Sequence, residues 1–226
     1  MCRSRPVRQL LPSSQLYALR TDGIGRPGPT EACDHLGMET DPIADALEGG
    51  PGVMFLITGI QASGKSTVAQ LLAERFPRSA HVRGDLFRRM LVASREEPLP
   101  GFGPVALAQL RLRHQLAVEA ADRYMVAGFT TVLQDCFLGE QFPWAVGQVR
   151  SRPLLVVMPA PRADEVARRE AGRRKKAYDP WTIDGLDQLL REQTPRIGLW
   201  LDSSDQRPDQ TVEEILARAW RDGRVD

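Results

Sequence analysis

Short apolar runs alternate with longer amphipathic segments from Val53 to the end of the chain. The apolar runs predict strands at 53–58, 80–83, 129–134, 153–158 and 196–201. The amphipathic segments predict helices at 65–76, 85–93, 104–127, 161–172, 184–192 and 211–222. The last of these begins with a capping-box pattern, Thr211 followed by Glu214. The alternation is typical of an α/β domain in which helices flank a parallel sheet.

The first 50 residues lack this periodicity and contain many turn-forming glycine and proline residues. Their first 20 residues are rich in arginine without acids, but Pro12 interrupts the apolar stretch, so a flexible tail is favoured over a targeting peptide. We expect a poorly ordered extension at 1–50 and one folded domain at 51–226. Because Met38 and Met54 precede the glycine-rich loop described next, the start of translation stays open.

A glycine-rich segment, Gly59–Thr67, follows the first predicted strand and opens the first long helix. Gly59 and Gly64 allow close backbone approach to phosphates, and Lys65 can reach their outer oxygens. The hydroxyl of Ser66 is the expected magnesium ligand. This pattern and its setting predict a phosphate-binding P-loop for a nucleoside triphosphate with Mg²⁺, with ATP or GTP left open. The expected nucleotide contacts are Gly59, Ala62, Ser63, Gly64, Lys65, Ser66 and Thr67.

Two aspartates follow predicted strands, at positions where parallel sheets bind ligands. Asp85 comes after the second strand, at the expected N-cap of the next helix, with Arg88 close enough to hold a substrate. Asp85 can act as a base toward a hydroxyl group, or simply cap the helix. Asp135 ends the third strand like a Walker B acid, where it can hold magnesium or contact the acceptor, or merely begin a loop.

A basic segment follows the fourth strand. Seven of its residues are basic, namely Arg162, Arg168, Arg169, Arg173, Arg174, Lys175 and Lys176. Arg169 and Arg173 lie four residues apart and can share one helix face, where two guanidinium groups would stabilise a migrating phosphoryl group. A solvated helix face and a nucleic-acid contact are the alternatives. No aromatic residue lies within the run, which favours an active-site lid over nucleic acid.

The composition suits one domain in a reducing compartment. The chain has 226 residues, 42% hydrophobic, and its 30 basic and 29 acidic residues give a formal charge of +1, with no overall field toward nucleic acid or membrane. Its three scattered cysteines lead us to expect a cytoplasmic protein. The apolar runs are shorter than the roughly 20 residues that span a bilayer, so no transmembrane helix is expected.

From residue 53 to about 220 the sequence resembles small P-loop kinases, most closely the chloramphenicol phosphotransferase-like group. The resemblance is carried by Gly59–Thr67, Asp85, the run Asp135–Gly139, Arg169 with Glu170, and Arg173. It implies a P-loop NTPase fold of the nucleoside-kinase type, a five-stranded parallel sheet with the P-loop strand in the middle, and a mobile lid containing the arginines. It also implies that Asp85 is the general base and that Lys65, Arg169 and Arg173 stabilise the transferred phosphoryl group.

Chloramphenicol itself is not indicated, because the stretch 194–202 differs in character from the antibiotic-modifying enzyme. The run from Arg83 to Arg88 is also similar to adenylylsulfate kinases and polynucleotide kinases. The leading hypothesis is a kinase that uses ATP and Mg²⁺ to phosphorylate a hydroxyl of a small molecule. A nucleotide-dependent switch protein and a polynucleotide 5′-kinase are the alternatives. The acceptor and the oligomeric state stay open.

Overall fold

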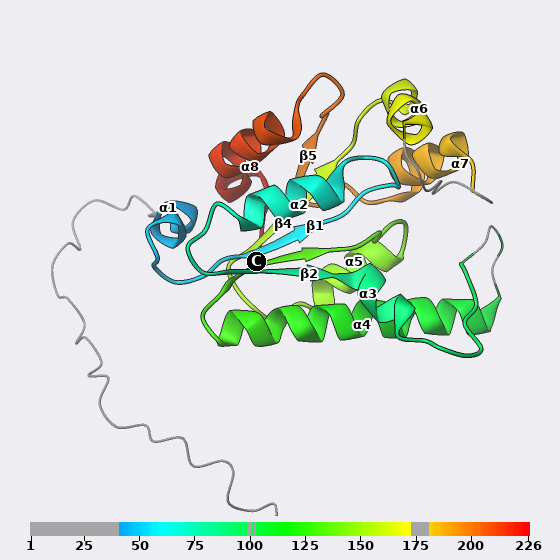
Figure 1. Ribbon diagram of the computed structural model, residues 1–226, viewed down its shortest axis with the longest axis horizontal. Helices are drawn as coiled ribbons and strands as arrows, with labels where there is room; N and C mark the ends of the chain where they lie inside the picture. Colours follow the sequence, from blue (N-terminus) through cyan, green and yellow to red (C-terminus); the bar gives the residue numbers. More distant parts are fainter. Residues whose placement is uncertain (1–40, 99–100, 102, 173–180) are drawn as a thin grey trace, which may run out of the picture. The chain divides into compact units, whose positions relative to one another are not determined.

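The computed structural model describes residues 41–98, 101, 103–172 and 181–226, and a parallel sheet lies at its centre (Figure 1). Its strands run in the order β2 (Ser79–Arg83), β3 (Thr130–Gln134), β1 (Met54–Ile57), β4 (Leu154–Pro159) and β5 (Leu199–Leu201). The strand that leads into the P-loop, β1, is therefore in the middle of the parallel sheet. This confirms the predicted α/β fold and its central strand.

The strand register brings the candidate site residues to one edge of the sheet. Ile57 pairs with Gln134, and Gln134 pairs with Arg83, so β1, β3 and β2 end level with one another. The loops that follow these strands begin the P-loop and carry Asp135 and Asp85. Ligands of parallel sheets bind beyond these carboxyl ends.

Alternate residues of β1 face two separate hydrophobic cores. Met54 and Leu56 pack into one core, Phe55 and Ile57 into the other, and all four are fully buried. A strand buried on both faces reads as a continuous apolar run, which is why β1 was easy to predict. Helices α1, α2 and α8 cover the face of Phe55, and α4 and α5 cover the other face (Figure 1). Their bounds are α1 (Pro42–Leu47), α2 (Lys65–Ala73), α4 (Pro104–Val126), α5 (Gln141–Gln148) and α8 (Pro208–Asp222).

Three further helices lie toward the end of the sheet to which the strand arrows point (Figure 1). They are α3 (Gly84–Arg89), α6 (Ala163–Ala171) and α7 (Ile183–Gln188), and α7 continues as a π-helical turn at Leu189–Gln193. In the part of the chain that the structure describes, no helix is long and apolar enough to cross a membrane.

The folded domain begins before residue 51, which corrects the expected extension at 1–50. Helix α1 starts after Asp41, whose side chain accepts a hydrogen bond from the N–H of Ile43 at 2.9 Å. Ile43 and Ala46 are buried against the core under α2 and α8. Six residues are too short to show a helical period, so the sequence pattern did not reveal this helix. The rest of the expected extension, residues 1–40, lies outside the described residues.

Two other elements and one helix start also differ from the predictions. Helix α5 was missed because it contains Pro143 and Gly147, yet it forms because Phe142 and Ala145 are fully buried. A two-residue strand, β6 (Arg224–Val225), pairs antiparallel with β4 and adds a sixth strand to the predicted five.

The predicted capping box at Thr211 is wrong, because α8 already begins at Pro208. The backbone N–H of Arg207 donates to Oε1 of Gln210 at 2.9 Å and closes the actual helix start. Thr211 is buried, and its hydroxyl donates to Oε1 of Gln206 at 2.9 Å. A proline in the first turn is compatible with a helix, because the N–H groups there have no partner within the helix.

Candidate active site

The P-loop, Gly59–Thr67, wraps around the side chain of Lys65. The Lys65 ammonium group is largely buried and donates to the carbonyl of Ile60 at 2.9 Å. Gly59 and Gly64 have φ angles of +146° and +90°, and Ala62, with φ of 60°, adopts a left-handed conformation that is rare for a side-chain-bearing residue. Such strain is kept where surrounding structure enforces it, as at ligand sites. The loop therefore has the tight curvature that phosphate binding requires.

The start of α2 completes the phosphate-binding geometry. The first N–H groups of a helix have no acceptor within it, and the helix dipole makes this end attractive to anions. Ser66 and Thr67 are exposed in the first turn, and Ser63 is buried in the loop before it. The structure thus brings the predicted nucleotide contacts together at one helix end.

Asp85 lies in the first turn of α3, whereas the N-cap position predicted for it is taken by Arg83. Its carboxylate accepts hydrogen bonds from Nε of Arg88 at 3.0 Å and Nε of Arg89 at 2.8 Å. Burial acts to raise the pKa of Asp85, but the two arginines outweigh it, so the pKa lies below its ordinary value. The carboxylate is therefore ionised at neutral pH, and it can act as a weak base that accepts a proton.

Asp135 is buried in an ion pair with Arg113 of α4. Nε of Arg113 donates to Oδ2 of Asp135 at 2.7 Å, Nη2 donates to Oδ1, and the N–H of Cys136 donates to Oδ1 at 2.8 Å. A Cβ on Gly84 would overlap this carboxylate, so the close packing needs glycine there. Burial acts to raise the pKa of Asp135, and the charge of Arg113 outweighs it and lowers the pKa. The predicted magnesium and substrate contacts of Asp135 would require this pair to open.

Electrostatic interactions link the two aspartates to the P-loop. Burial acts to lower the pKa of Arg113, but the charge and hydrogen bonds of Asp135 and the charge of Asp85 raise it. Burial raises the pKa of the Cys136 thiol, and the charge of Lys65 acts against that rise. The strands before Asp85, Asp135 and the P-loop end level with one another, and Gly84, next to Asp85, packs against the Asp135 carboxylate. Asp85, Asp135 and the P-loop therefore lie at one edge of the sheet.

Arg113 is a residue of the candidate site that the sequence pattern did not reveal. It occupies the buried stripe of α4, between Ala106 and Ala117 at helical spacing. A charged residue on an apolar stripe is rarely buried without a partner. That position was the available signal, but the partner, Asp135, is 22 residues away and only the fold brings it near.

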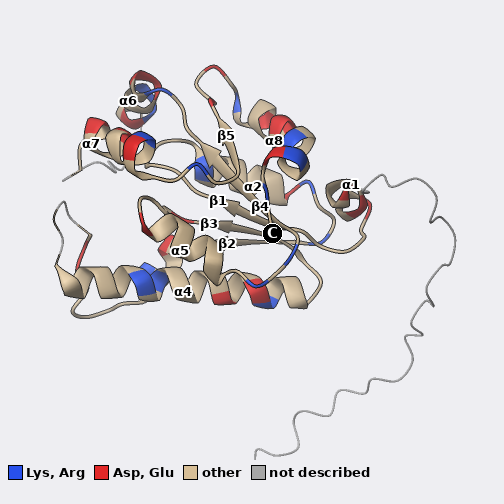
Figure 2. Ribbon diagram, turned by 180° about the vertical axis from the view of Figure 1, so that it is seen from behind, with Lys and Arg blue, Asp and Glu red and all other residues tan. Residues whose placement is uncertain are grey.

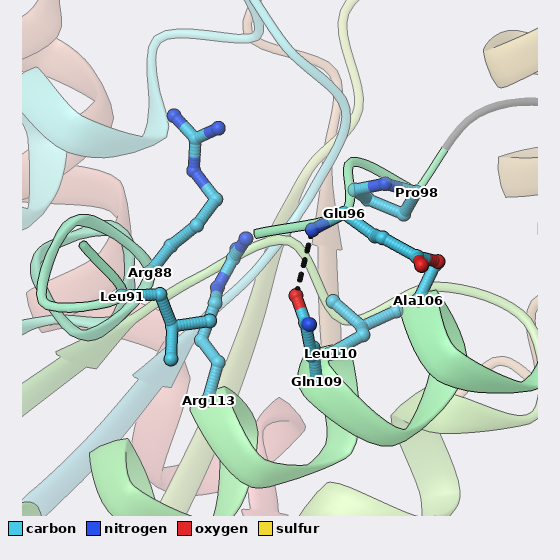
Figure 3. A pocket seen from close by; sticks show the side chains of 8 residues that line it. All are labelled: Arg88, Leu91, Glu96, Pro98, Ala106, Gln109, Leu110 and Arg113. Carbon is cyan, nitrogen blue, oxygen red and sulfur yellow. Dashed lines mark hydrogen bonds between the residues drawn. The ribbon is translucent and has the colours of Figure 1, made fainter. Parts of the chain in front are cut away.

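A hollow of about 260 Å³, including the part open to solvent, lies between α3, α4 and the loop 91–98 (Figure 3). We call it the α4 hollow; its lining is Arg88, Leu91, Glu96, Pro98, Ala106, Gln109, Leu110 and Arg113. Figure 3 shows Arg88 and Arg113 on one side of it and Gln109 and Leu110 on the other. Gln109 holds the loop through the N–H of Glu96 at 2.9 Å and the carbonyl of Ser94 at 2.7 Å.

Arg169, on α6, contacts the P-loop directly. Its Nη1 donates to the carbonyl of Ser63 at 3.0 Å, and its Nη2 donates to the carbonyl of Ser203, after β5, at 2.6 Å. Glu165 holds its Nε at 2.6 Å. The structure thus places this predicted arginine beside the phosphate site.

The other predicted lid arginine, Arg173, lies outside the described residues, as do Arg174, Lys175 and Lys176. On the described part of the segment, Arg168 is exposed and pairs with Glu165, and Arg162 pairs with Asp205. Figure 2 shows acidic as well as basic residues on α6. Up to residue 172, where the described part of the segment ends, the mixed charges do not form a basic patch of the kind that binds nucleic acid.

Comparison with known proteins supports the fold. A family model described as "AAA domain" matches residues 54–195. A search of curated proteins finds no matching sequence.

Several solved structures are similar to this chain over most of its length. An unliganded sugar kinase from Janibacter sp. HTCC2649 matches with a TM-score of 0.58 and 18% identity, over 74% of this chain and 94% of that one. The APS kinase of Mycobacterium tuberculosis, in complex with AMPPNP and APS, has a TM-score of 0.55 and 22% identity over 74% and 96%. A gluconokinase from Sinorhizobium meliloti 1021 has a TM-score of 0.51 and 16% identity over 74% and 90%. The predicted resemblance to P-loop kinases is confirmed at the level of the fold.

Proposed function

The chain belongs to the AAA domain family, and from this premise we propose that it is a kinase that transfers the γ-phosphoryl group of ATP to a hydroxyl group of a small molecule. The main observation in support is that the P-loop, Asp85 and the α4 hollow meet at one edge of the sheet. A P-loop alone would also suit a motor protein or a nucleotide-dependent switch protein. A kinase needs in addition a group that can accept the hydroxyl proton and a place for the acceptor molecule, and Asp85 and the α4 hollow could supply these.

The donor half is the P-loop. Its backbone and Lys65 hold the β and γ phosphates, and Arg169 offsets charge on the migrating group. Magnesium, when bound, neutralises part of the phosphate charge. Ser66 is exposed at the start of α2, and its hydroxyl would be a ligand of this ion. Because both oxygens of Asp135 accept hydrogen bonds, we assign Asp135 to holding Arg113 instead.

The acceptor half is built on α3 and α4. The acceptor oxygen attacks the γ-phosphorus, the bond from phosphorus to the bridging oxygen breaks, and ADP leaves with that electron pair. Asp85 takes the hydroxyl proton. Its lowered pKa suits a proton that moves late, as in the loose transition states of phosphoryl transfer. Arg88 holds Asp85 and lines the α4 hollow, which fits its predicted role in acceptor binding.

A screen tests this function. Hydroxylated metabolites, antibiotics and nucleosides are added to protein with ATP and Mg²⁺, and ADP release is measured, with Lys65→Ala as the control. At least one acceptor is expected to raise ADP release in the wild type and not in the variant. Slow release that no acceptor changes would instead favour a switch protein. Transfer of labelled phosphate to a short oligonucleotide would favour a polynucleotide kinase.

A further inference from the structure

The α4 hollow combines two guanidinium groups with apolar walls. Arg88 and Arg113 line it, and most of the remaining lining is apolar, from Leu91, Pro98, Ala106 and Leu110. Arginine binds carboxylates and phosphates through paired N–H groups, and it does so more strongly where water is partly excluded. A neutral acceptor would need neither guanidinium group.

Arg88 already binds a carboxylate at the hollow. Both oxygens of Glu97 lie 2.6 Å from its Nη1, in addition to the bond from its Nε to Asp85. Glu97 belongs to the loop 91–98, and its side chain is 41% exposed. Ion pairs with this much exposure contribute little to stability, so another anion can replace Glu97.

Arg113 lines the hollow from α4, on the same side as Arg88 (Figure 3). Asp135 engages its Nε and Nη2, and no hydrogen bond from its Nη1 to any described residue is present. The Arg113 side chain is only 12% exposed, and Asp135 fixes its guanidinium plane. A rigid, partly buried donor of this kind loses little conformational entropy when it binds a ligand.

We propose that the acceptor carries an anionic group, a carboxylate or a phosphate, which Arg88 and Arg113 bind in the α4 hollow, and that Glu97 occupies Arg88 until the acceptor replaces it. This inference rests on the proposed kinase function.

The test measures binding of a matched panel to the protein saturated with Mg²⁺ and ADP, so that the P-loop is already filled. The probes are polyols of three to six carbons, each as the neutral polyol, the corresponding acid and the phosphate monoester. Titration is followed by calorimetry. An anionic member is expected to bind at least about tenfold more tightly than its neutral counterpart, since a hydrogen bond to a charged group contributes that much. The better of the acid and the phosphate identifies the anion.

Variants with matched controls assign the effect to residues. Arg88→Gln should abolish the preference for anions, whereas Arg89→Gln should keep it, because Arg89 also pairs with Asp85 but does not line the hollow. Glu97→Gln should tighten anion binding about two- to fivefold, the range of an exposed ion pair. Glu96→Gln removes the same charge from the neighbouring residue and should have a smaller effect.

No preference for anions, or equal behaviour of Arg88→Gln and Arg89→Gln, would overturn the inference. Equal gains from Glu96→Gln and Glu97→Gln would remove the role given to Glu97. Phosphorylation of a neutral polyol without any anionic preference would contradict the inference and leave the kinase function standing. Failure of the wild type to bind Mg²⁺ and ADP would overturn both.

Discussion

The P-loop is one continuous segment, whereas the α4 hollow is lined by side chains from α3, α4 and the loop between them. The P-loop uses backbone groups and one buried lysine, and its shape is set by φ angles at a few positions. The hollow uses arginines held by acidic partners, most of them partly exposed. The donor half of the site can therefore be predicted from local sequence, whereas the acceptor half depends on tertiary contacts.

The largest expected effect is that of Lys65→Met, which should impair the donor half of the site and leave the acceptor half intact. Lys65→Met removes the buried ammonium group that would contact the phosphates, so ATP binding should weaken and turnover should fall by about 10²–10³-fold. Affinity for an acceptor in the α4 hollow should change little. Isothermal titration with ATP and steady-state ADP release measure the two effects. Equal losses of ATP and acceptor affinity would show that the halves are not separable.

Breaking the Arg113 pair tests the tertiary support of the acceptor half. Arg113→Met leaves Asp135 charged and buried without its partner, which should lower the free energy of unfolding by about 3–5 kcal/mol. The second substitution, Asp135→Asn, removes the buried carboxylate charge that has lost its partner, so the double variant should regain part of the lost free energy of unfolding. Urea unfolding of the single and double variants measures this. A single variant as stable as the wild type would mean that the pair is not needed.

Arg169 connects helix α6 to the donor half. Arg169→Gln loses its charge-assisted bonds to the carbonyls of Ser63 and Ser203, so kcat/KM for ATP should fall about 10- to 100-fold. Arg168→Gln is the matched control, because Arg168 also pairs with Glu165 but is 74% exposed. Kinetics at varied ATP compare the two. If kcat/KM falls by a similar factor in both variants, the loss comes from the broken pair with Glu165 and not from the contact between Arg169 and the P-loop.

A further expected effect is a pH dependence of stability from His114, which is buried on α4. Its ring packs 4.5 Å from that of Phe137, and burial lowers its pKa to about 4. The unfolded chain takes up the proton near pH 6.5, so this contribution to stability is present above pH 6.5 and is lost as the pH falls toward 4. The charges that face it are Asp135 and Arg113.

His114→Leu should remove this part of the pH dependence, up to about 1.4 kcal/mol per pH unit. The difference between the wild-type and variant unfolding curves at pH 4 to 7 isolates it, since the carboxylates titrate in both proteins. Parallel curves would show that His114 is not the titrating group.

The sequence predicted strands such as β1 and β4 because each is a short apolar run, and it predicted the P-loop because its residues are adjacent. Helix α5 was missed because local propensity, with Pro143 and Gly147, opposed what burial of Phe142 stabilises. The pairing of Asp135 with Arg113 was missed because two residues far apart in sequence meet only through the packing of α4 on the sheet. Arg88 was predicted near the substrate, but Glu97 as its partner was not, since nothing local links them.

The proposed role of Asp85 is tested by transfer of labelled γ-phosphate from ATP to an acceptor found in the screen, compared between the wild type and Asp85→Asn. We expect the variant to bind ATP as tightly as the wild type but to transfer phosphate about 10²–10⁴-fold more slowly, the contribution of a general base. Transfer at the wild-type rate by Asp85→Asn would contradict this role.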